Sequence, residues 1–199
     1  MKQHIPAGLI ALRFALGPLL YVMAVAQAGP WPMGAATTAG FASDVLDGVV
    51  ARRLGVATQQ LCEADSWVDT WYYAWVAVAA WRAAPDAVTG FALPLAALIG
   101  LQLFQMVVDY TKYRRVASYH AYISKAWGIT LYVASVALLA FHTAGPYLAS
   151  AIAFGMLGIL ENIAITLMLP RWTHDVKGFW LAPGLRREQL AAPGADEAA

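Results

Sequence analysis

The sequence predicts an all-α membrane protein with six transmembrane helices. Of its 199 residues, 60% are hydrophobic and only 13% are charged, a composition outside the range of ordinary soluble domains. The chain also divides into six apolar stretches. Each is close to the length of about 20 residues that a helix needs to cross a hydrocarbon core of about 30 Å. Together these observations favour a helical bundle embedded in a lipid bilayer.

The six predicted spans occupy most of the chain. They are 7–27, 31–50, 65–81, 87–108, 123–141 and 147–169. Gly29-Pro30, Pro85 and Gly145-Pro146 interrupt three of the connections, where helix-breaking residues belong. From Ala182 onward the chain becomes rich in Ala, Pro, Gly and charge. We therefore expect a membrane domain over 1–181 and a flexible tail over 182–199.

The positions of lysine and arginine orient the predicted bundle, because cytoplasmic loops carry an excess of both. Basic residues gather before the first span, between the second and third, between the fourth and fifth, and after the sixth, whereas Arg82 lies at the other side. We therefore predict that both termini face the cytoplasm and that a polar cavity opens on the cytoplasmic side. The expected location of the protein is the cell (inner) membrane. The net charge of +1 gives no reason to expect a nucleic-acid partner.

Four of the 12 acidic residues, Asp44, Asp47, Asp65 and Asp69, lie in or at the ends of the second and third predicted spans. An ionised carboxylate costs at least about 2.5 kcal/mol at the bilayer centre, so such residues usually mark functional sites. The first two are three residues apart and the last two are four apart, so each pair shares one helix face. Because the two spans are antiparallel, we expect the pairs to face each other near the cytoplasmic side.

Carboxylates that gather in a poorly solvated place repel one another and take up protons unless cations neutralise them. Oxygen-only ligation suits Mg²⁺ or Mn²⁺ and argues against zinc. Two metals about 3.5 to 4 Å apart are a standard means of stabilising the attacking and leaving oxygens at phosphorus. We therefore predict two divalent cations on the four aspartates, with Arg52 nearby to hold a diphosphate. The alternative, solvated helix-end aspartates paired with Arg52 and Arg53, explains one such residue better than four.

These residues form a pattern that closely resembles the signature of the CDP-alcohol phosphatidyltransferase family. The signature reads D-x-x-D-G-x-x-A-R and, eight residues later, G-x-x-x-D-x-x-x-D. Seven of its eight positions match, namely Asp44, Asp47, Gly48, Ala51, Arg52, Asp65 and Asp69. The departure is Leu61, which stands where the family carries its second glycine and which places a side chain toward the expected nucleotide pocket.

The resemblance implies that a CDP-linked donor loses CMP while an acceptor hydroxyl attacks its phosphorus. By position, all four aspartates would ligate the metals and Asp69 would also act as the general base. The residues implied to line the CDP site are Asp47, Gly48, Ala51, Arg52 and Leu61. The expected donor is CDP-diacylglycerol, the expected acceptor is a small alcohol or alcohol phosphate, and the expected assembly is a homodimer.

Four further basic residues are candidates for substrate binding: Arg13, Arg114, Arg115 and Lys125. Lys125 resembles a lysine that family members carry at the start of the fifth span. Arg13 resembles the arginine that ends an N-x-x-T-x-x-R element, although the Asn and Thr are absent here. The structural alternatives are a snorkelling side chain for Lys125, a topogenic cluster for Arg114 and Arg115, and pairing with an acidic neighbour for Arg13.

Three other functions use the same features. A CDP-amino alcohol:diacylglycerol phosphotransferase would need the same residues, with the lipid as acceptor. A divalent-cation transporter would spread acidic groups along its full depth, whereas these aspartates gather at one end. An inactive relative that binds lipid or nucleotide has Leu61 as its only indication. The sequence does not identify the acceptor alcohol.

Overall fold

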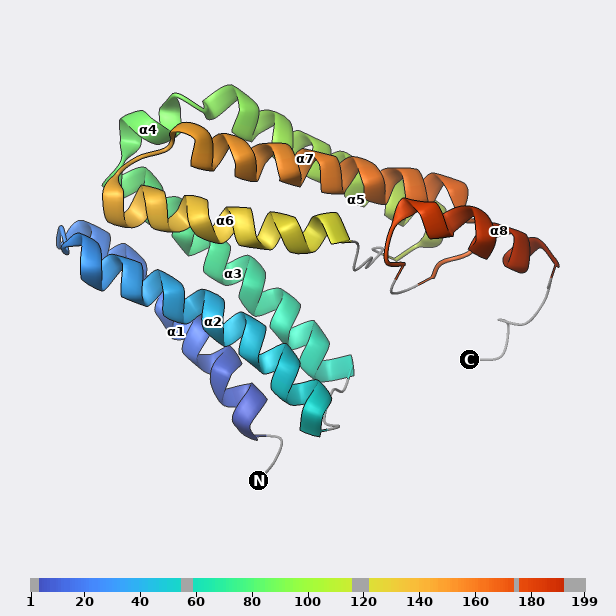
Figure 1. The fold of residues 1–199 in the computed structure, drawn as a ribbon, viewed down its shortest axis with the longest axis horizontal. Helices are drawn as coiled ribbons and strands as arrows, with labels where there is room; N and C mark the ends of the chain where they lie inside the picture. The colour runs from blue at the N-terminus through green and yellow to red at the C-terminus, as the bar shows by residue number, and fades with distance from the viewer. Residues whose placement is uncertain (1–3, 55–58, 116–121, 174–175, 192–199) are drawn as a thin grey trace. The chain divides into compact units, whose positions relative to one another are not determined.

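The computed structural model describes residues 4–54, 59–115, 122–173 and 176–191 (Figure 1). Within these ranges the regular elements are all helices, which confirms the predicted all-helical fold. They are α1 (His4–Val25), α2 (Pro30–Leu54), α3 (Gln59–Ala83), α4 (Pro85–Thr89), α5 (Ala92–Tyr113), α6 (Tyr122–Phe141), α7 (Gly145–Met168), the 3-10 helix η1 (Phe179–Leu181) and α8 (Ala182–Ala191).

Within the described residues, four helices are long and apolar enough to cross a membrane, which makes the chain a multi-pass membrane protein. They are Pro6–Val25, Ala92–Tyr113, Tyr122–Phe141 and Gly145–Met168. Helices α2 and α3 contain 25 residues each, which is sufficient length for a span. Their acidic and basic side chains lower their mean hydropathy, so they are less apolar than the four candidate spans. The same aspartates that predict a functional site thus make these two helices less hydrophobic than the other four.

The fourth predicted span differs from the structure. The predicted span 87–108 is interrupted, because α4 ends at Thr89 and Phe91 has a non-helical conformation (φ −111°, ψ 13°) before α5 begins. Helix α5 then continues to Tyr113, where Arg114 takes a left-handed conformation with φ 56°. Residues 182–191 of the predicted tail form the helix α8. Ala182 at its start is fully buried against Ile165 and Leu169.

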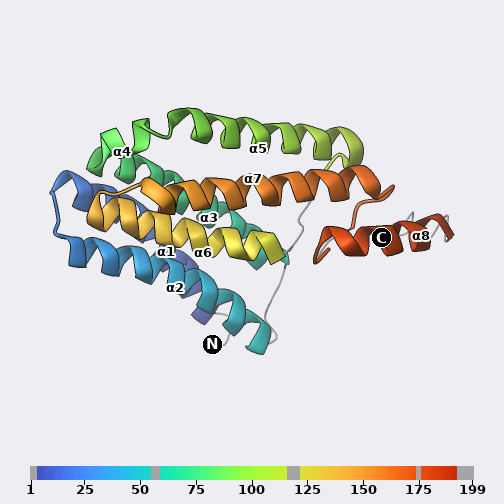
Figure 2. The ribbon, with the colours of Figure 1, turned by 45° about the horizontal axis from the view of Figure 1, so that its top comes forward.

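The chain divides into two compact units, residues 1–90 with 132–147, and residues 91–131 with 148–199. In the first unit α1 lies against both α2 and α3 (Figures 1 and 2). The end of α6 joins this unit through Tyr132, whose ring stacks on Phe41 of α2 with centroids 4.4 Å apart. The Tyr132 hydroxyl also lies 3.0 Å from the Thr38 hydroxyl.

Two glycines allow the helices of the first unit to approach closely. A Cβ atom at Gly40 of α2 would lie 2.3 Å from the Tyr72 hydroxyl oxygen of α3, and Tyr72 is only 2% exposed. The Tyr72 hydroxyl donates a hydrogen bond to the Thr37 carbonyl at 3.3 Å. At Gly17 of α1, a Cβ atom would lie 3.1 Å from the Trp75 ring of α3. Small residues therefore bring together the three helices that carry the polar side chains described below.

In the second unit, a buried polar network joins α5 to α7. Asp109 is fully buried and accepts hydrogen bonds from the Thr166 hydroxyl at 2.7 Å and from the Gln105 amide at 3.4 Å. Lys112 Nζ donates to the Thr166 carbonyl at 2.7 Å, and the Tyr113 hydroxyl donates to the Leu169 carbonyl at 2.7 Å. These donors bind the carbonyl groups of Thr166 and Leu169 at the C-terminal end of α7, where a helix generally leaves its last carbonyls without intrahelical partners.

Replacement of Gly40 by alanine tests the close approach of α2 and α3. The added methyl group would overlap the buried Tyr72 ring, so Gly40→Ala is expected to destabilise the protein by about 1–3 kcal/mol. Thermal unfolding of the purified protein in detergent measures the change. The matched control is Gly34→Ala in the same helix, where the new Cβ atom would lie 3.8 Å from the Ala140 side chain. Equal melting temperatures for the two variants would contradict the packing described.

Candidate active site

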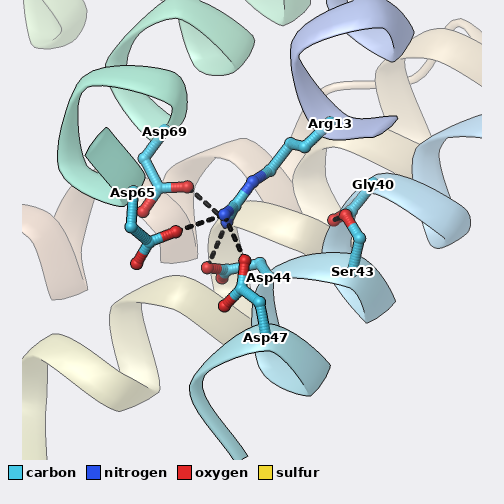
Figure 3. Close-up of polar contacts among 7 residues, drawn as sticks. All are labelled: Arg13, Gly40, Ser43, Asp44, Asp47, Asp65 and Asp69. Atoms are coloured by element: carbon cyan, nitrogen blue, oxygen red, sulfur yellow. Dashed lines mark hydrogen bonds and ion pairs between the residues drawn. The ribbon is translucent and has the colours of Figure 1, made fainter. Parts of the chain in front are cut away.

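The four aspartates of the sequence motif come from two neighbouring helices, near the ends that residues 55–58 connect. Asp44 and Asp47 lie one turn apart on α2, and Asp65 and Asp69 lie one turn apart on α3. Figure 3 shows that both pairs point toward one place, where the side chain of Arg13 reaches them from α1. The structure therefore brings together the predicted metal ligands and one of the basic candidates.

The Arg13 guanidinium forms ion pairs with all four carboxylates (Figure 3). Its Nη1 atom pairs with Asp44 of α2 and with Asp69 of α3. Its Nη2 atom pairs with Asp65 of α3 and, at 2.6 Å, with Asp47 of α2. Each terminal nitrogen thus joins one carboxylate of α2 to one of α3. The guanidinium group of Arg13 therefore links α1, α2 and α3 at one point.

The site is closed on one side and open on the other. The side chains of Arg13 and Asp47 are 1% and 4% exposed, so they form its inner wall. Asp44, Asp65 and Asp69 are 35%, 33% and 34% exposed. Three of the carboxylates are therefore accessible from the open side, whereas the guanidinium is buried.

The donor set fits divalent cations. One carboxylate oxygen from each of Asp44, Asp47 and Asp65 lies within 4.8 Å of the other two, and the fourth carboxylate, Asp69, shares Arg13 with them. Four negative charges face one positive charge within these contacts, which leaves most of the negative charge uncompensated. Hard cations with oxygen ligands, such as Mg²⁺ and Mn²⁺, suit this combination of charge and atom type.

Ser43, next to Asp44, does not contribute to the cluster. It is buried, and its hydroxyl donates a hydrogen bond of 2.7 Å to the Gly40 carbonyl of its own helix (Figure 3). This bond satisfies the hydroxyl within α2. Among the side chains drawn in Figure 3, carboxylates and one guanidinium are the polar groups that meet at this place.

The residues predicted to line a nucleotide pocket are only partly described. Gly48 is half-buried on α2, and Leu61 is half-buried on α3, one turn before Asp65. The backbones of Ala51 and Arg52 belong to α2, but their side chains lie outside the described part of the chain. The structure thus places these residues on the two helices that carry the aspartates, and their contacts with a nucleotide stay predictions.

The other basic candidates belong to the second unit. Lys125 lies in the first turn of α6 with its Nζ atom 5.3 Å from the centre of the Tyr122 ring. Arg114 ends α5, and the Arg115 guanidinium lies 5.9 Å from the centre of the Trp172 ring. Cation–π contacts of this kind anchor basic side chains beside aromatic ones. A role of these three residues in binding substrate stays a prediction.

Sequence reasoning missed the central position of Arg13 and the burial of Asp109. Pairing of Arg13 with an acidic neighbour was one of two alternatives, but a partnership with four aspartates was not expected. The available signal was an arginine inside an apolar span, which needs partners of opposite charge. Asp109 fell one residue beyond a predicted span, yet it is fully buried. Its spacing of four residues from Gln105 was the available signal.

Comparison with known proteins identifies one family. A family model described as CDP-alcohol phosphatidyltransferase matches residues 3–169, a range that contains α1 to α7, Arg13 and the four aspartates. Comparisons with curated proteins and with solved structures find no match. The match extends over most of the chain and agrees with the resemblance that the sequence motif indicated.

Binding of Mn²⁺ or Mg²⁺ to the aspartates is expected to stabilise the folded protein. A ligand at 100 times its Kd adds about 2.7 kcal/mol to the free energy of unfolding, so the melting temperature should rise with the cation and fall again with a chelator. Asp65→Asn removes one ligand and is expected to shift this rise to cation concentrations at least about tenfold higher.

Asp86→Asn is the matched control, because Asp86 lies in the first turn of α4 and not in the cluster. Thermal unfolding at a series of Mn²⁺ concentrations compares the two variants. If Asp65→Asn responds to Mn²⁺ like the unaltered protein, the cation binds somewhere else.

Proposed function

The chain belongs to the CDP-alcohol phosphatidyltransferase family, and from that premise we propose that it moves a phosphatidyl group from CDP-diacylglycerol to a hydroxyl. The acceptor is a small alcohol or alcohol phosphate, and the other product is CMP. The family comprises transferases of phospholipid synthesis that act on substituted phosphate groups. The observation that carries the proposal is the convergence of four carboxylates from α2 and α3 on one partly open site.

We propose that Asp44, Asp47, Asp65 and Asp69 hold two divalent cations, Mg²⁺ or Mn²⁺. Such cations, when bound, supply positive charge to the attacking and leaving oxygens at phosphorus. The fixed placement of the carboxylates matters as well as their charge. They come from helices and not from loops, and Gly40 and Gly17 permit the close packing of those helices. A rigid arrangement of this kind places reacting groups with little loss of entropy in the reaction.

Asp69 is the proposed general base. In the reaction, the acceptor oxygen forms a bond to the phosphorus that carries the diacylglycerol. The bond between that phosphorus and the CMP oxygen breaks, and the hydroxyl proton passes to the Asp69 carboxylate. A general base must lie within hydrogen-bond reach of the proton that it removes. The Asp69 side chain is 34% exposed, which supports access of an acceptor hydroxyl to its carboxylate.

The nucleotide part of the donor is proposed to bind along α2 beside Asp47. Gly48 leaves space next to the carboxylates, and Ala51 and Arg52 follow one helical turn later. Arg52 carries the positive charge that a diphosphate requires. Leu61 is proposed to narrow this pocket from α3, because it stands where the family signature has a glycine.

The proposed topology has six spans, in which α2 and α3 cross the bilayer in addition to the four apolar helices. A helix of 25 residues is about 38 Å long at 1.5 Å per residue, so both have the required length. The proposed location of the site is the cytoplasmic side of the cell (inner) membrane, which the basic residues in the connections nearest to the aspartates support. The membrane domain is proposed to cover residues 1–181, and a homodimer is proposed from the family alone.

Removal of the proposed base should stop turnover without preventing substrate binding. Asp69→Asn keeps the size of the side chain but cannot accept the proton, so CMP release from radiolabelled CDP-diacylglycerol is expected to fall by at least about 10²–10⁴-fold. The variant should still bind CDP in a direct binding assay. Asp86→Asn serves as the control with unchanged turnover. Undiminished CMP release by Asp69→Asn would reject the assignment of the base.

A panel of substrates identifies the acceptor and tests the direction of transfer. The purified protein is incubated with Mn²⁺, CDP-diacylglycerol and, one at a time, glycerol phosphate, inositol phosphate, serine and inositol. CMP release with one of these supports the proposal and names the acceptor. Release only from a CDP-amino alcohol with diacylglycerol would reverse the assignment. Absence of release in every mixture would indicate a relative that binds lipid or nucleotide without turnover.

A further inference from the structure

We propose that Arg13 competes with divalent cations for the four aspartates, so that cation binding requires the guanidinium to leave. When cations are scarce, Arg13 holds the carboxylates of α2 and α3 together. This inference rests on the proposed two-cation function and adds to it a step of exchange within the protein itself. Arg13 thereby sets how tightly the site binds its cations.

The position of Arg13 requires partners of opposite charge. It lies in the candidate span Pro6–Val25, seven residues or about 10 Å along the helix from Pro6 at 1.5 Å per residue. The residue is 1% exposed. A buried guanidinium that loses its partners is strongly destabilising. The aspartates therefore stabilise Arg13 as much as Arg13 stabilises them.

The guanidinium is held through its two terminal nitrogens. Nη1 and Nη2 make the four ion pairs, whereas the buried Nε atom has no hydrogen-bond partner among the described residues. An arginine fixed for structure alone commonly uses all of its donors, since an unpaired buried donor is costly. Here the part of the side chain nearest to α1 is left unsatisfied so that its end can reach the carboxylates.

The carboxylates that bind Arg13 are the same ones that a cation needs. The three carboxylates with oxygens within 4.8 Å of one another, those of Asp44, Asp47 and Asp65, all pair with Arg13. Arg13 Nη2 lies 2.6 Å from Asp47 Oδ2, and an Mg²⁺ ion requires its oxygen ligands at about 2.0–2.1 Å. A guanidinium and two divalent ions cannot share these carboxylates, because they compete for oxygens and repel each other.

Competition predicts that loss of Arg13 changes cation affinity in an unusual direction. If the carboxylates must first release Arg13, the apparent Kd for the cation equals the intrinsic Kd divided by the fraction of protein in which the carboxylates are unpaired, and so it is higher. Removal of the guanidinium should therefore tighten cation binding. An arginine that only supports the ligands from behind would have the opposite effect, since loss of such a supporting partner weakens metal binding.

The experiment compares Arg13→Gln, Arg13→Lys and the unaltered protein in detergent, with Mn²⁺ as the probe. Binding of Mn²⁺ is followed by the electron paramagnetic resonance signal of the free ion, and thermal unfolding is followed in excess chelator. For Arg13→Gln we expect an apparent Kd for Mn²⁺ at least about tenfold lower, together with a lower melting temperature in chelator. Arg13→Lys retains the charge but not the two-nitrogen fork, so intermediate values are expected.

Arg82→Gln is the matched control, because it removes the same charge from the last turn of α3 in the same unit. It should change neither quantity. Equal or weaker Mn²⁺ binding by Arg13→Gln would overturn the competition while leaving the two-cation function in place. If Arg13→Gln does not fold, Arg13→Lys carries the test, and unchanged or weaker binding by it overturns the proposal. No Mn²⁺ binding by the unaltered protein would instead reject the proposed function.

Discussion

The arrangement of the first unit depends on the attraction between one guanidinium and four carboxylates in a poorly solvated place. Arg13 is placed in an apolar helix, and the aspartates lie on the two helices packed against it. Neither set of charges is stable there alone, because burial without a partner costs several kcal/mol per ion. The pairing therefore decides which faces of α2 and α3 turn toward α1, and with them the direction of every carboxylate in the site.

Close helix packing favours small residues on α2 and α3, whereas the proposed reaction requires charged residues on the same helices. Close contact needs small residues such as Gly40, where the Tyr72 ring of α3 occupies the space of a side chain. The proposed reaction needs carboxylates on the same helices, which lowers their hydropathy until they no longer qualify as apolar spans by composition. Apolar helices such as α5 and α7 supply the membrane anchoring instead.

The spacing of residues within each helix predicted a large part of the site, whereas the pairing between residues far apart in sequence could not be predicted. Asp44 with Asp47 and Asp65 with Asp69 share helix faces by periodicity, so their convergence was predictable. The partnership of Arg13 joins residues 31 to 56 positions apart in sequence, from Asp44 to Asp69, and no periodic pattern reveals it. The interruption before α5 depends on the backbone of Phe91. Helix α8 depends on burial of Ala182 against the end of α7, whereas its composition resembles that of a flexible tail.

The central claim is that carboxylates from two neighbouring helices hold a pair of divalent cations. The most direct measurement is anomalous X-ray scattering from crystals of the protein grown with Mn²⁺. The account predicts two manganese peaks about 3.5 to 4 Å apart, each in contact with oxygens of Asp44, Asp47, Asp65 or Asp69. Crystals that show these side chains pointing apart, toward lipid or bulk water, with manganese bound elsewhere or not at all, would contradict it.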